Sequence, residues 1–336
     1  MSVRYKDTEY TYISAKVRAM EASLVKKDCL ERMIAAENSD GAAAYLREYG
    51  IDVAGMTAAE REDVLISALG GGMSEIEKNA PIPEIFAFFR YPYDCSNIKA
   101  LIKCSKRGID AEGMLFSIGS VPIKKLVESF TRGDFSALPE NMAKAAKEAS
   151  AAYESTKDPQ KIDFILDKAC FADMDACAKK AEKFKIDFIS ELVNAKADLT
   201  NFMICLRVLR MNCGELGRSY IDEALLDCGC VGKKKFAEAY ARGEEQLVAL
   251  IAKNGYDRVA RKLGANASLG FAEKVCDNER IELAKKAKRV TFGVEIPAAY
   301  IVALETAMQN VRIVLAGKDA GISADTINER IRECYV

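Results

Sequence analysis

The amino-acid sequence predicts an all-α fold, and three observations support this prediction. Apolar residues recur at steps of three and four, as in Ile13, Val17 and Met20, which is the period of one face of an amphipathic helix. No stretch alternates apolar and polar residues in the manner of a half-buried strand. All seven prolines lie at expected joints between helices.

The N-terminal quarter is expected to contain several helices with recognisable ends. We predict a long helix from Thr11 to Glu37, followed by a short one that Gly50 closes. Thr57 and Glu60 form a capping box, which opens a third helix. That helix should end at Gly70-Gly71-Gly72. No strand precedes this triple glycine and no Gly-Lys-Ser/Thr follows it, so it is interpreted as a flexible joint rather than a phosphate loop.

The middle of the chain begins with a dense aromatic stretch. Such a stretch is interpreted as a core wedge between helices rather than a ligand box; its members are Phe86, Phe88, Phe89, Tyr91 and Tyr93. Asp94 is then expected to be the N-cap of a helix that runs through Arg107 and ends at Gly108.

Further helices follow from capping and proline signals. Asp158-Pro159 should start one helix, because proline fits the first helical position. Others are expected over residues 176–195 and from Asp198. Near the C-terminus, a helix should open at Pro297 and end at Gly317. Ser323 should cap the last helix.

One stretch of the sequence occurs twice. Residues 119–134 read GSVPIKKLVESFTRGD, and residues 229–244 read GCVGKKKFAEAYARGE. Matching positions, among them Gly119 and Gly229, are all 110 residues apart. A repeat at a fixed long offset predicts a duplicated supersecondary unit.

A second signal divides the chain into three units. Asp94-xx-Asn97 recurs as Asp198-xx-Asn201, and in a weaker third copy Glu305 stands in the place of the aspartate, before Asn310. We therefore predict three helical repeat units, which cover residues 1–152, 153–254 and 255–336, the last one shorter than the others.

Composition and charge exclude several classes of protein. The chain has 336 residues and a net charge of −1, so no basic field favours nucleic acid. Its N-terminus is charged where a signal peptide needs an apolar run, and no stretch is apolar for the length that a membrane span requires. Eleven cysteines, an odd number scattered along the chain, are typical of reduced thiols in a cytosolic protein.

The sequence shows no pattern for catalysis or for binding a cofactor. It has no histidine, which removes the commonest general base and most catalytic zinc sites. Cys228 and Cys230 are the only closely spaced cysteines, and no second pair could complete a metal site. No carboxylate pair stands in an apolar helix stripe. We expect no catalytic, cofactor-binding or metal-binding residues and no small-molecule substrate.

Several segments together resemble a known family, the C subunits of the archaeal and bacterial V-type (A-type) ATP synthases, which are similar to the d subunit of the vacuolar proton pump. The resembling segments are YTYISAKVRAMEASL, FRYPYDCSNIKALIK, RVLRMNCG, GCVGKKKFAEAYARG and the C-terminal VRIVLAGKDAGISADTINERIRECYV. The most characteristic are Tyr91-x-Tyr93-Asp94-xx-Asn97-x-Lys99 and the Arg-x-x-Tyr-Val end. Cys228-Gly229 departs from the Gly-Gly that the family would have there.

The resemblance implies a fold and a role. The fold would be three similar helical-bundle domains that form a funnel about a pseudo-threefold axis. The role would be that of a non-catalytic rotor subunit in the central stalk, with the shaft subunits and the membrane ring of ion-carrying subunits as its partners. It would lie on the cytoplasmic face of the membrane and contact the membrane only through the ring. Two other classes stay open: an α-helical repeat scaffold that binds protein partners, and a histidine-free enzyme.

The repeated stretch also contains recurring cations that could contact a partner. They stand at equivalent positions in the two copies: Lys124, Lys125, Arg132, Lys234, Lys235 and Arg242. One interpretation is a pseudosymmetric contact surface. The other, which we favour, is a pair of solvated helix faces retained from the duplication.

Overall fold

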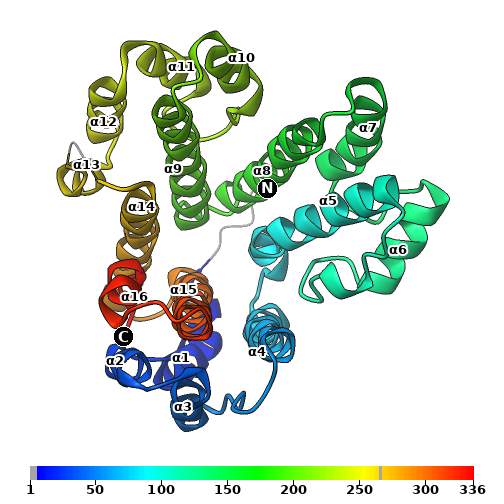
Figure 1. The fold of residues 1–336 in the computed structure, drawn as a ribbon. Helices are drawn as coiled ribbons and strands as arrows, with labels where there is room; N and C mark the ends of the chain where they lie inside the picture. The colour runs from blue at the N-terminus through cyan, green and yellow to red at the C-terminus, as the bar shows by residue number, and fades with distance from the viewer. Residues whose placement is uncertain (1–5, 265–266) are drawn as a thin grey trace. The chain divides into compact units, whose positions relative to one another are not determined.

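The computed structural model describes residues 6–264 and 267–336, and every regular element in this part of the chain is a helix (Figure 1). The all-α prediction is therefore confirmed. The chain divides into two compact units. One comprises residues 84–255, and the other comprises residues 6–83 together with the described residues of 256–336.

The unit of residues 84–255 is built around two long helices. In chain order its helices are η4 (Pro83–Phe89), α5 (Tyr91–Arg107), η5 (Glu112–Met114), α6 (Ile123–Arg132), α7 (Glu140–Thr156), α8 (Pro159–Glu182), α9 (Phe188–Met211), α10 (Gly214–Ala224), α11 (Lys233–Arg242) and α12 (Glu244–Lys253). α8 packs against α5, α7 and α9, and α9 packs against α10, α11 and α12. These contacts bury the apolar stripes that the sequence displays.

The aromatic stretch before α5 lies in the core of this unit. Phe86, Phe88 and Phe89 are buried, as the core-wedge interpretation predicts, whereas Tyr91 and Tyr93 are half-buried. The buried thiol of Cys177 on α8 lies 3.3 Å from the carbonyl oxygen of Glu84 and can donate to it. η4 is thereby held against α8.

The other unit combines both ends of the chain. Its helices are η1 (Asp7–Tyr10), α1 (Thr11–Met20), η2 (Glu21–Ser23), α2 (Lys27–Ala35), α3 (Ser39–Ala44), η3 (Tyr45–Tyr49), α4 (Ala58–Asn79), α13 (Asp257–Lys262), α14 (Leu269–Ala284), η6 (Lys285–Arg289), α15 (Glu295–Asp319) and α16 (Ala324–Arg330). α15 is its central helix and packs against α1, α2, α3, α4, α14 and α16 (Figure 1). Burial of each leucine or isoleucine here contributes roughly 1.5–3 kcal/mol.

The compact units and the predicted repeat units are different divisions of the chain. The predicted second repeat, 153–254, lies wholly within one compact unit. The described residues of 256–336 pack with the N-terminal residues up to Pro83, because α15 buries its apolar surface against α1 to α4. The three-repeat division stays a prediction, and the compact units describe packing.

Several predicted helix ends are confirmed. Thr57 and Glu60 form the capping box at the start of α4. The Asp158 side chain accepts a hydrogen bond from the backbone of Gln160, and Ser323 caps α16 in the same way. Gly108 ends α5 in the left-handed conformation, with φ of 66°.

Two glycine predictions are wrong, because these glycines allow close packing instead of ending a helix. Gly70-Gly71-Gly72 lies inside α4, which continues to Asn79. A Cβ atom on Gly72 would lie 2.4 Å from Leu304 Cδ2 of α15. Likewise α15 continues past Gly317 to Asp319, and a Cβ there would lie 2.8 Å from the Ile327 side chain.

Two predicted helices are each broken in two. The helix expected over residues 11–37 ends at Met20 and resumes at Lys27, because the extended link buries both Leu24 and Val25. The helix expected over residues 176–195 is interrupted between Glu182 and Phe188. In that second break Lys185 takes a left-handed conformation with φ of 65°, and Ile186 is buried.

Candidate functional site

A buried carboxylate on α5 holds the loop that follows the helix. Asp94 is fully buried, and its Oδ2 accepts hydrogen bonds from the Ser120 backbone at 3.0 Å and from the Ser120 hydroxyl at 2.5 Å. Its Oδ1 accepts from the Val121 backbone at 3.2 Å. Burial raises the pKa of Asp94, although these hydrogen bonds favour the carboxylate. The N-cap prediction is wrong, because α5 begins at Tyr91 and Asp94 binds the distant loop.

Asn97 lies one turn further along α5 and completes this arrangement. Its Nδ2 donates to the Phe116 carbonyl at 2.9 Å, and its Oδ1 accepts from the Phe116 N–H at 2.7 Å. Both backbone groups of one loop residue are thus satisfied by one amide side chain. We call a clamp a buried asparagine that binds both backbone groups of a distant residue, together with the aspartate three residues earlier where there is one.

The second repeat contains a clamp with the same pattern. Asp198 of α9 accepts from the Cys230 and Val231 backbone N–H groups, both at 3.1 Å. Asn201 accepts from the Leu226 N–H at 2.8 Å and donates to its carbonyl at 3.2 Å. As with Asp94, the prediction that a helix starts at Asp198 is wrong, because the residue lies inside α9.

The two repeated glycines are needed for the clamps. A Cβ atom on Gly119 would lie 2.3 Å from Asp94 Oδ1, and a Cβ on Gly229 would lie 2.3 Å from Asp198 Oδ1. No real Cβ tolerates such a contact, so each loop can approach its aspartate only where it has a glycine. Gly229 also has a φ of 101°, which favours glycine. The 110-residue repeat therefore marks the loop side of a duplicated clamp.

A third, simpler clamp holds the C-terminal segment. Asn310 of α15 accepts from the Arg332 N–H at 2.8 Å and donates to the Arg332 carbonyl at 3.0 Å. The aspartate position, three residues earlier, is Ala307. The prediction that Glu305 takes the place of the aspartate is wrong. Glu305 instead forms an ion pair with Arg280 at 3.2 Å.

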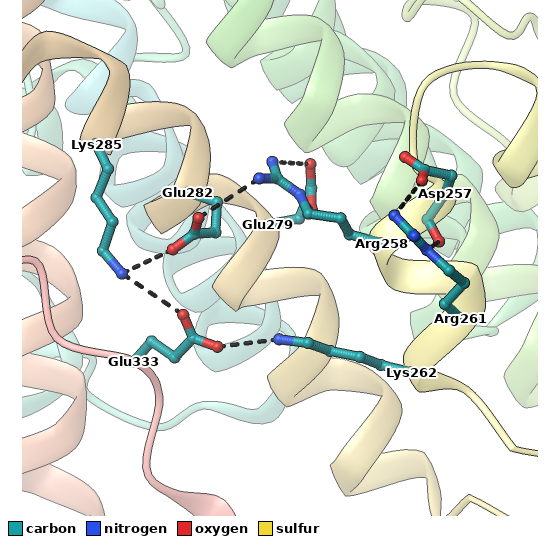
Figure 2. A network of polar contacts seen from close by, with 8 residues as sticks. All are labelled: Asp257, Arg258, Arg261, Lys262, Glu279, Glu282, Lys285 and Glu333. Carbon is teal, nitrogen blue, oxygen red and sulfur yellow. Dashed lines mark hydrogen bonds and ion pairs between the residues drawn. The ribbon is translucent and has the colours of Figure 1, made fainter. Parts of the chain in front are cut away.

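Side chains of α14 reinforce the third clamp. Asn278 Oδ1 accepts from the Glu333 N–H at 2.8 Å, and Asp277 accepts from Arg332 Nε at 2.9 Å. Glu333 itself pairs with Lys262 at 3.0 Å and with Lys285 at 3.6 Å. Figure 2 shows that Lys285 also forms an ion pair with Glu282. Glu282 in turn pairs with Arg258 of α13, so the network reaches that helix.

The clamps in residues 84–255 fix the start of the two helices that carry the repeated cations. α6 begins two residues after Val121, and α11 begins two residues after Val231. All six predicted residues lie on these helices and are exposed: Lys124, Lys125, Arg132, Lys234, Lys235 and Arg242. Neither helix has an acidic residue in its first turn, where the helix dipole favours one.

The buried carboxylates of the described residues serve structure. Besides Asp94 and Asp198, Asp173 of α8 is buried, and it accepts from the Asn141 and Met142 N–H groups at 3.0 and 2.9 Å. It thereby provides hydrogen-bond acceptors for backbone N–H groups in the first turn of α7, which have no partner within the helix. Buried carboxylates with backbone donors on their oxygens are positioned to hold loops and helix ends, not to move a proton.

The closely spaced cysteines also belong to a clamp. Cys230 supplies a backbone N–H to Asp198, and Cys228 is half-buried beside it. Burial raises the pKa of the Cys228 thiol to about 12. A thiol of this kind is a poor metal ligand at neutral pH. Among the residues that the structure describes, no group of three Cys, Asp or Glu side chains could hold a metal ion.

Sequence reasoning did not identify the buried residues of the three clamps as loop anchors. A usable signal was present, since Asp94, Asn97, Asp198, Asn201 and Asn310 interrupt apolar helix faces that are otherwise buried. A polar residue on such a face needs a buried partner. The glycines at 119 and 229 then indicated which loops supply it.

Fold and site together define a class of protein: an all-helical repeat protein whose buried polar groups fix surface loops. A model of the ATP synthase (C/AC39) subunit family matches residues 13–330. The chain belongs to this family, and it is a non-catalytic subunit of a V-type ATPase complex, an assembly that transports ions. The C subunit of the V-type sodium ATPase of Enterococcus hirae is 21% identical over an alignment of 340 positions, which covers 97% of this chain and 99% of that protein.

Along the described residues, no helix combines the length and apolar character needed to cross a bilayer.

Proposed function

We propose that the chain is a rotor subunit of the central stalk, which joins the shaft subunits to the membrane ring of a V-type ATPase. Its place would be on the cytoplasmic face, where it contacts the membrane only through the ring. The family match over residues 13–330 carries this proposal. Since the subunit is non-catalytic, its contribution would be to transmit torque during ATP-driven or ATP-producing ion transport.

The clamps support a mechanical role. A part that transmits torque must hold its contact surfaces in place without help from a bound ligand. The buried Asp94 and Asp198 tie a loop to a long helix at two equivalent places, and each loop leads directly into a helix with exposed cations. We propose that three such repeats surround a pseudo-threefold axis as a funnel. In that arrangement equivalent loops would reach the same partner.

The exposed lysines of α6 and α11 are our candidates for that contact. Placing Lys124 and Lys125 in the first turn of a helix costs a few tenths of a kcal/mol against the helix dipole. The same arrangement occurs at Lys234 and Lys235. A cost that is repeated in both copies favours contact with an acidic partner surface over a solvated face.

Cross-linking in the assembled complex tests the rotor role. The chain is cross-linked with a cleavable reagent to a membrane-ring subunit in one sample and to a stationary subunit in another. We expect the ring cross-link to leave ATP hydrolysis intact and the stationary cross-link to stop it until the reagent is cleaved. A ring cross-link that stops hydrolysis would overturn the rotor proposal.

Charge reversal tests the contact surface separately. Lys234→Glu with Lys235→Glu should lower the salt concentration at which the protein leaves the complex, because a favourable charge contact becomes repulsive. Lys144→Glu is the matched control, since Lys144 is an exposed lysine of the same compact unit whose ion pair, with Glu140, is local. Equal salt sensitivity of both variants would favour the solvated-face interpretation.

A further inference from the structure

An apolar groove opens in the first repeat, between α5 and α6. It has a volume of about 500 Å³, and its lining includes Leu101, Ile109, Val127 and Phe130. Ile109 is 50% exposed and Val127 is 38% exposed. Met114, in the loop beside the groove, is 57% exposed. Exposed apolar residues that gather at a hollow are typical of a binding surface.

The second repeat has a helix at the corresponding place. Asn97 and its loop partner are 19 residues apart, whereas Asn201 and its partner are 25 residues apart. The second loop is therefore six residues longer. Those residues allow it to form α10, where the first repeat has only the single turn η5 (Figure 1).

α10 covers the surface that is equivalent to the groove. A Cβ atom on Gly217 of α10 would lie 2.5 Å from Tyr240 Oη and 3.0 Å from Val208 Cγ1. Tyr240 is the repeat equivalent of Phe130, and Val208 is that of Cys104. Phe130 and Cys104 both line the groove. What α10 covers in the second repeat is thus open in the first.

The buried face of α10 shows what kind of helix this surface accepts. Gly217, Ile221 and Ala224 are buried, at steps of four and three residues. The close approach at Gly217 leaves no room for a side chain there. A helix in this position therefore needs a small residue at the crossing point and an apolar residue one turn later.

The rim of the groove carries net negative charge. Its charged residues are Asp110, Glu112, Glu128 and Lys124, and all four are exposed. Because Glu128 also pairs with Arg132 at 4.0 Å, the carboxylates left to favour a cationic ligand are those of Asp110 and Glu112. A helix with lysine or arginine beside its apolar face would be complementary in charge.

We propose that this groove binds a short basic helix of another protein, which lies on the first repeat as α10 lies on the second. The bound helix places a glycine or alanine over Cys104 and Phe130. It inserts an aliphatic side chain beside Val127, and it turns its cations toward Asp110 and Glu112. This binding mode is that of an amphipathic helix in an apolar groove. It goes beyond the stalk role and does not depend on it.

A peptide titration against the purified full-length chain tests this proposal. The probe is a helix-stabilised, fluorescein-labelled copy of residues 214–226 in which the three acidic residues are replaced by lysine. We expect saturable binding by fluorescence anisotropy, and binding about 5-fold weaker for the unaltered sequence at low salt. The difference should shrink at high salt. No saturable binding of the lysine peptide overturns the proposal.

Two variants locate the site. Val127→Arg should weaken binding of the lysine peptide by about 10-fold or more, since it places a charge in the apolar groove. Met211→Arg is the matched control, because Met211 is an apolar residue that is 69% exposed in the second repeat. We expect less than about a 2-fold effect from it. Equal weakening by both variants overturns the proposal.

A charge exchange and a loop exchange make the test specific. Asp110→Lys with Glu112→Lys should reverse the preference, so that the unaltered acidic peptide binds more tightly than the lysine peptide. Replacing residues 110–115 by residues 214–225 should give the first repeat its own covering helix and abolish binding, with circular dichroism as the check of folding. If light scattering instead shows a dimer that Val127→Arg dissociates, a second copy of the chain is the occupant and the proposal is wrong.

Discussion

The clamps of residues 84–255 differ from the clamp that holds the C-terminal segment. Each of the first two uses a buried aspartate and an asparagine, whereas the third has Asn310 with Ala307 at the aspartate position. In the first two, the chain continues from the clamped loop into another helix. In the third, residues 331–336 form no regular element.

This difference indicates what each half of a clamp does. The asparagine fixes one loop residue, and it is present in all three places. The aspartate binds consecutive N–H groups just before α6 or α11, so it aims the helix that follows. In the third clamp, where the described residues 331–336 form no helix, the aspartate is absent, and Asp277 and Asn278 of α14 hold the segment instead.

Removing an aspartate should have the largest effect. Asp94→Ala leaves the buried Val121 N–H without its acceptor, and it also removes the acceptor of the Ser120 N–H and hydroxyl. We expect a loss of about 3 kcal/mol or more in the free energy of unfolding, measured by urea denaturation. Asp134→Ala is the control, because Asp134 is exposed and accepts only a local hydrogen bond from Ser136. Similar losses in both variants would contradict the assigned role of Asp94.

Filling the space beside an aspartate should have the next largest effect. Gly229→Ala forces a contact with Asp198 Oδ1 and strains a backbone at φ of 101°, so we expect a loss of about 2–4 kcal/mol. Gly119→Ala should cost less, because only the contact is forced. Gly113→Ala is the control, since no atom lies within 4 Å of its Cβ position.

A double-mutant cycle separates the two causes. If contact with the carboxylate is the main cause, the cost of Gly229→Ala should fall when Asp198→Ala is present. Unchanged cost in that background would show that backbone strain alone requires the glycine.

The sequence predicted several helix ends correctly because capping signals are local. Capping at Thr57, Asp158 and Ser323 depends on residues a few positions apart. The 110-residue repeat was visible for a different reason, because Gly119 and Gly229 stand in matching stretches of sequence that can be compared directly.

What the sequence could not predict depends on distant partners. Aspartate is a residue type that often caps the start of a helix, so Asp94 could be an N-cap. Only the hydrogen bonds from residues 120 and 121 show that it anchors a loop instead. Glycine is also a residue type that is common in joints between helices, so Gly72 could be one. Only the close packing of Leu304 against it shows why a glycine is needed inside the helix. In both cases the same local pattern fits two structures, and long-range packing decides between them.

Removing the asparagine of the third clamp should have a smaller, local effect. Asn310→Ala frees the N–H and the carbonyl of Arg332, which we expect to cost about 1–2 kcal/mol and to release the C-terminal segment. Hydrogen exchange should show faster exchange at residues 332–336, with little change in α15. Asn328→Ala, at an exposed position of α16, is the control. Unchanged exchange in Asn310→Ala would mean that α14 alone holds the segment.

The ion pairs of the C-terminal segment should give the smallest effect, one that depends on pH. Burial alone would raise the pKa of Glu333, but the hydrogen bond and charge of Lys262, with the charge of Lys285, hold it below its usual 4.5. A lowered pKa in the folded state stabilises the segment above pH 4.5, and this contribution is lost as the pH falls below that value. Since the Glu333 side chain is 37% exposed, screening limits the effect to less than about 1 kcal/mol.

Hydrogen-exchange protection of Cys334 and Tyr335, corrected for the intrinsic rates, measures this contribution. Between pH 5.5 and pH 3.5 it should fall by about 3-fold in the unaltered chain and stay nearly flat in Glu333→Gln. Glu329→Gln, on the exposed side of α16, should keep the fall. If Glu333→Gln kept the fall too, the ion pairs of Glu333 would not be its cause. The hydrogen bond from Arg332 Nε to Asp277 would then remain, with the clamp of Asn310, as the contact that holds the segment.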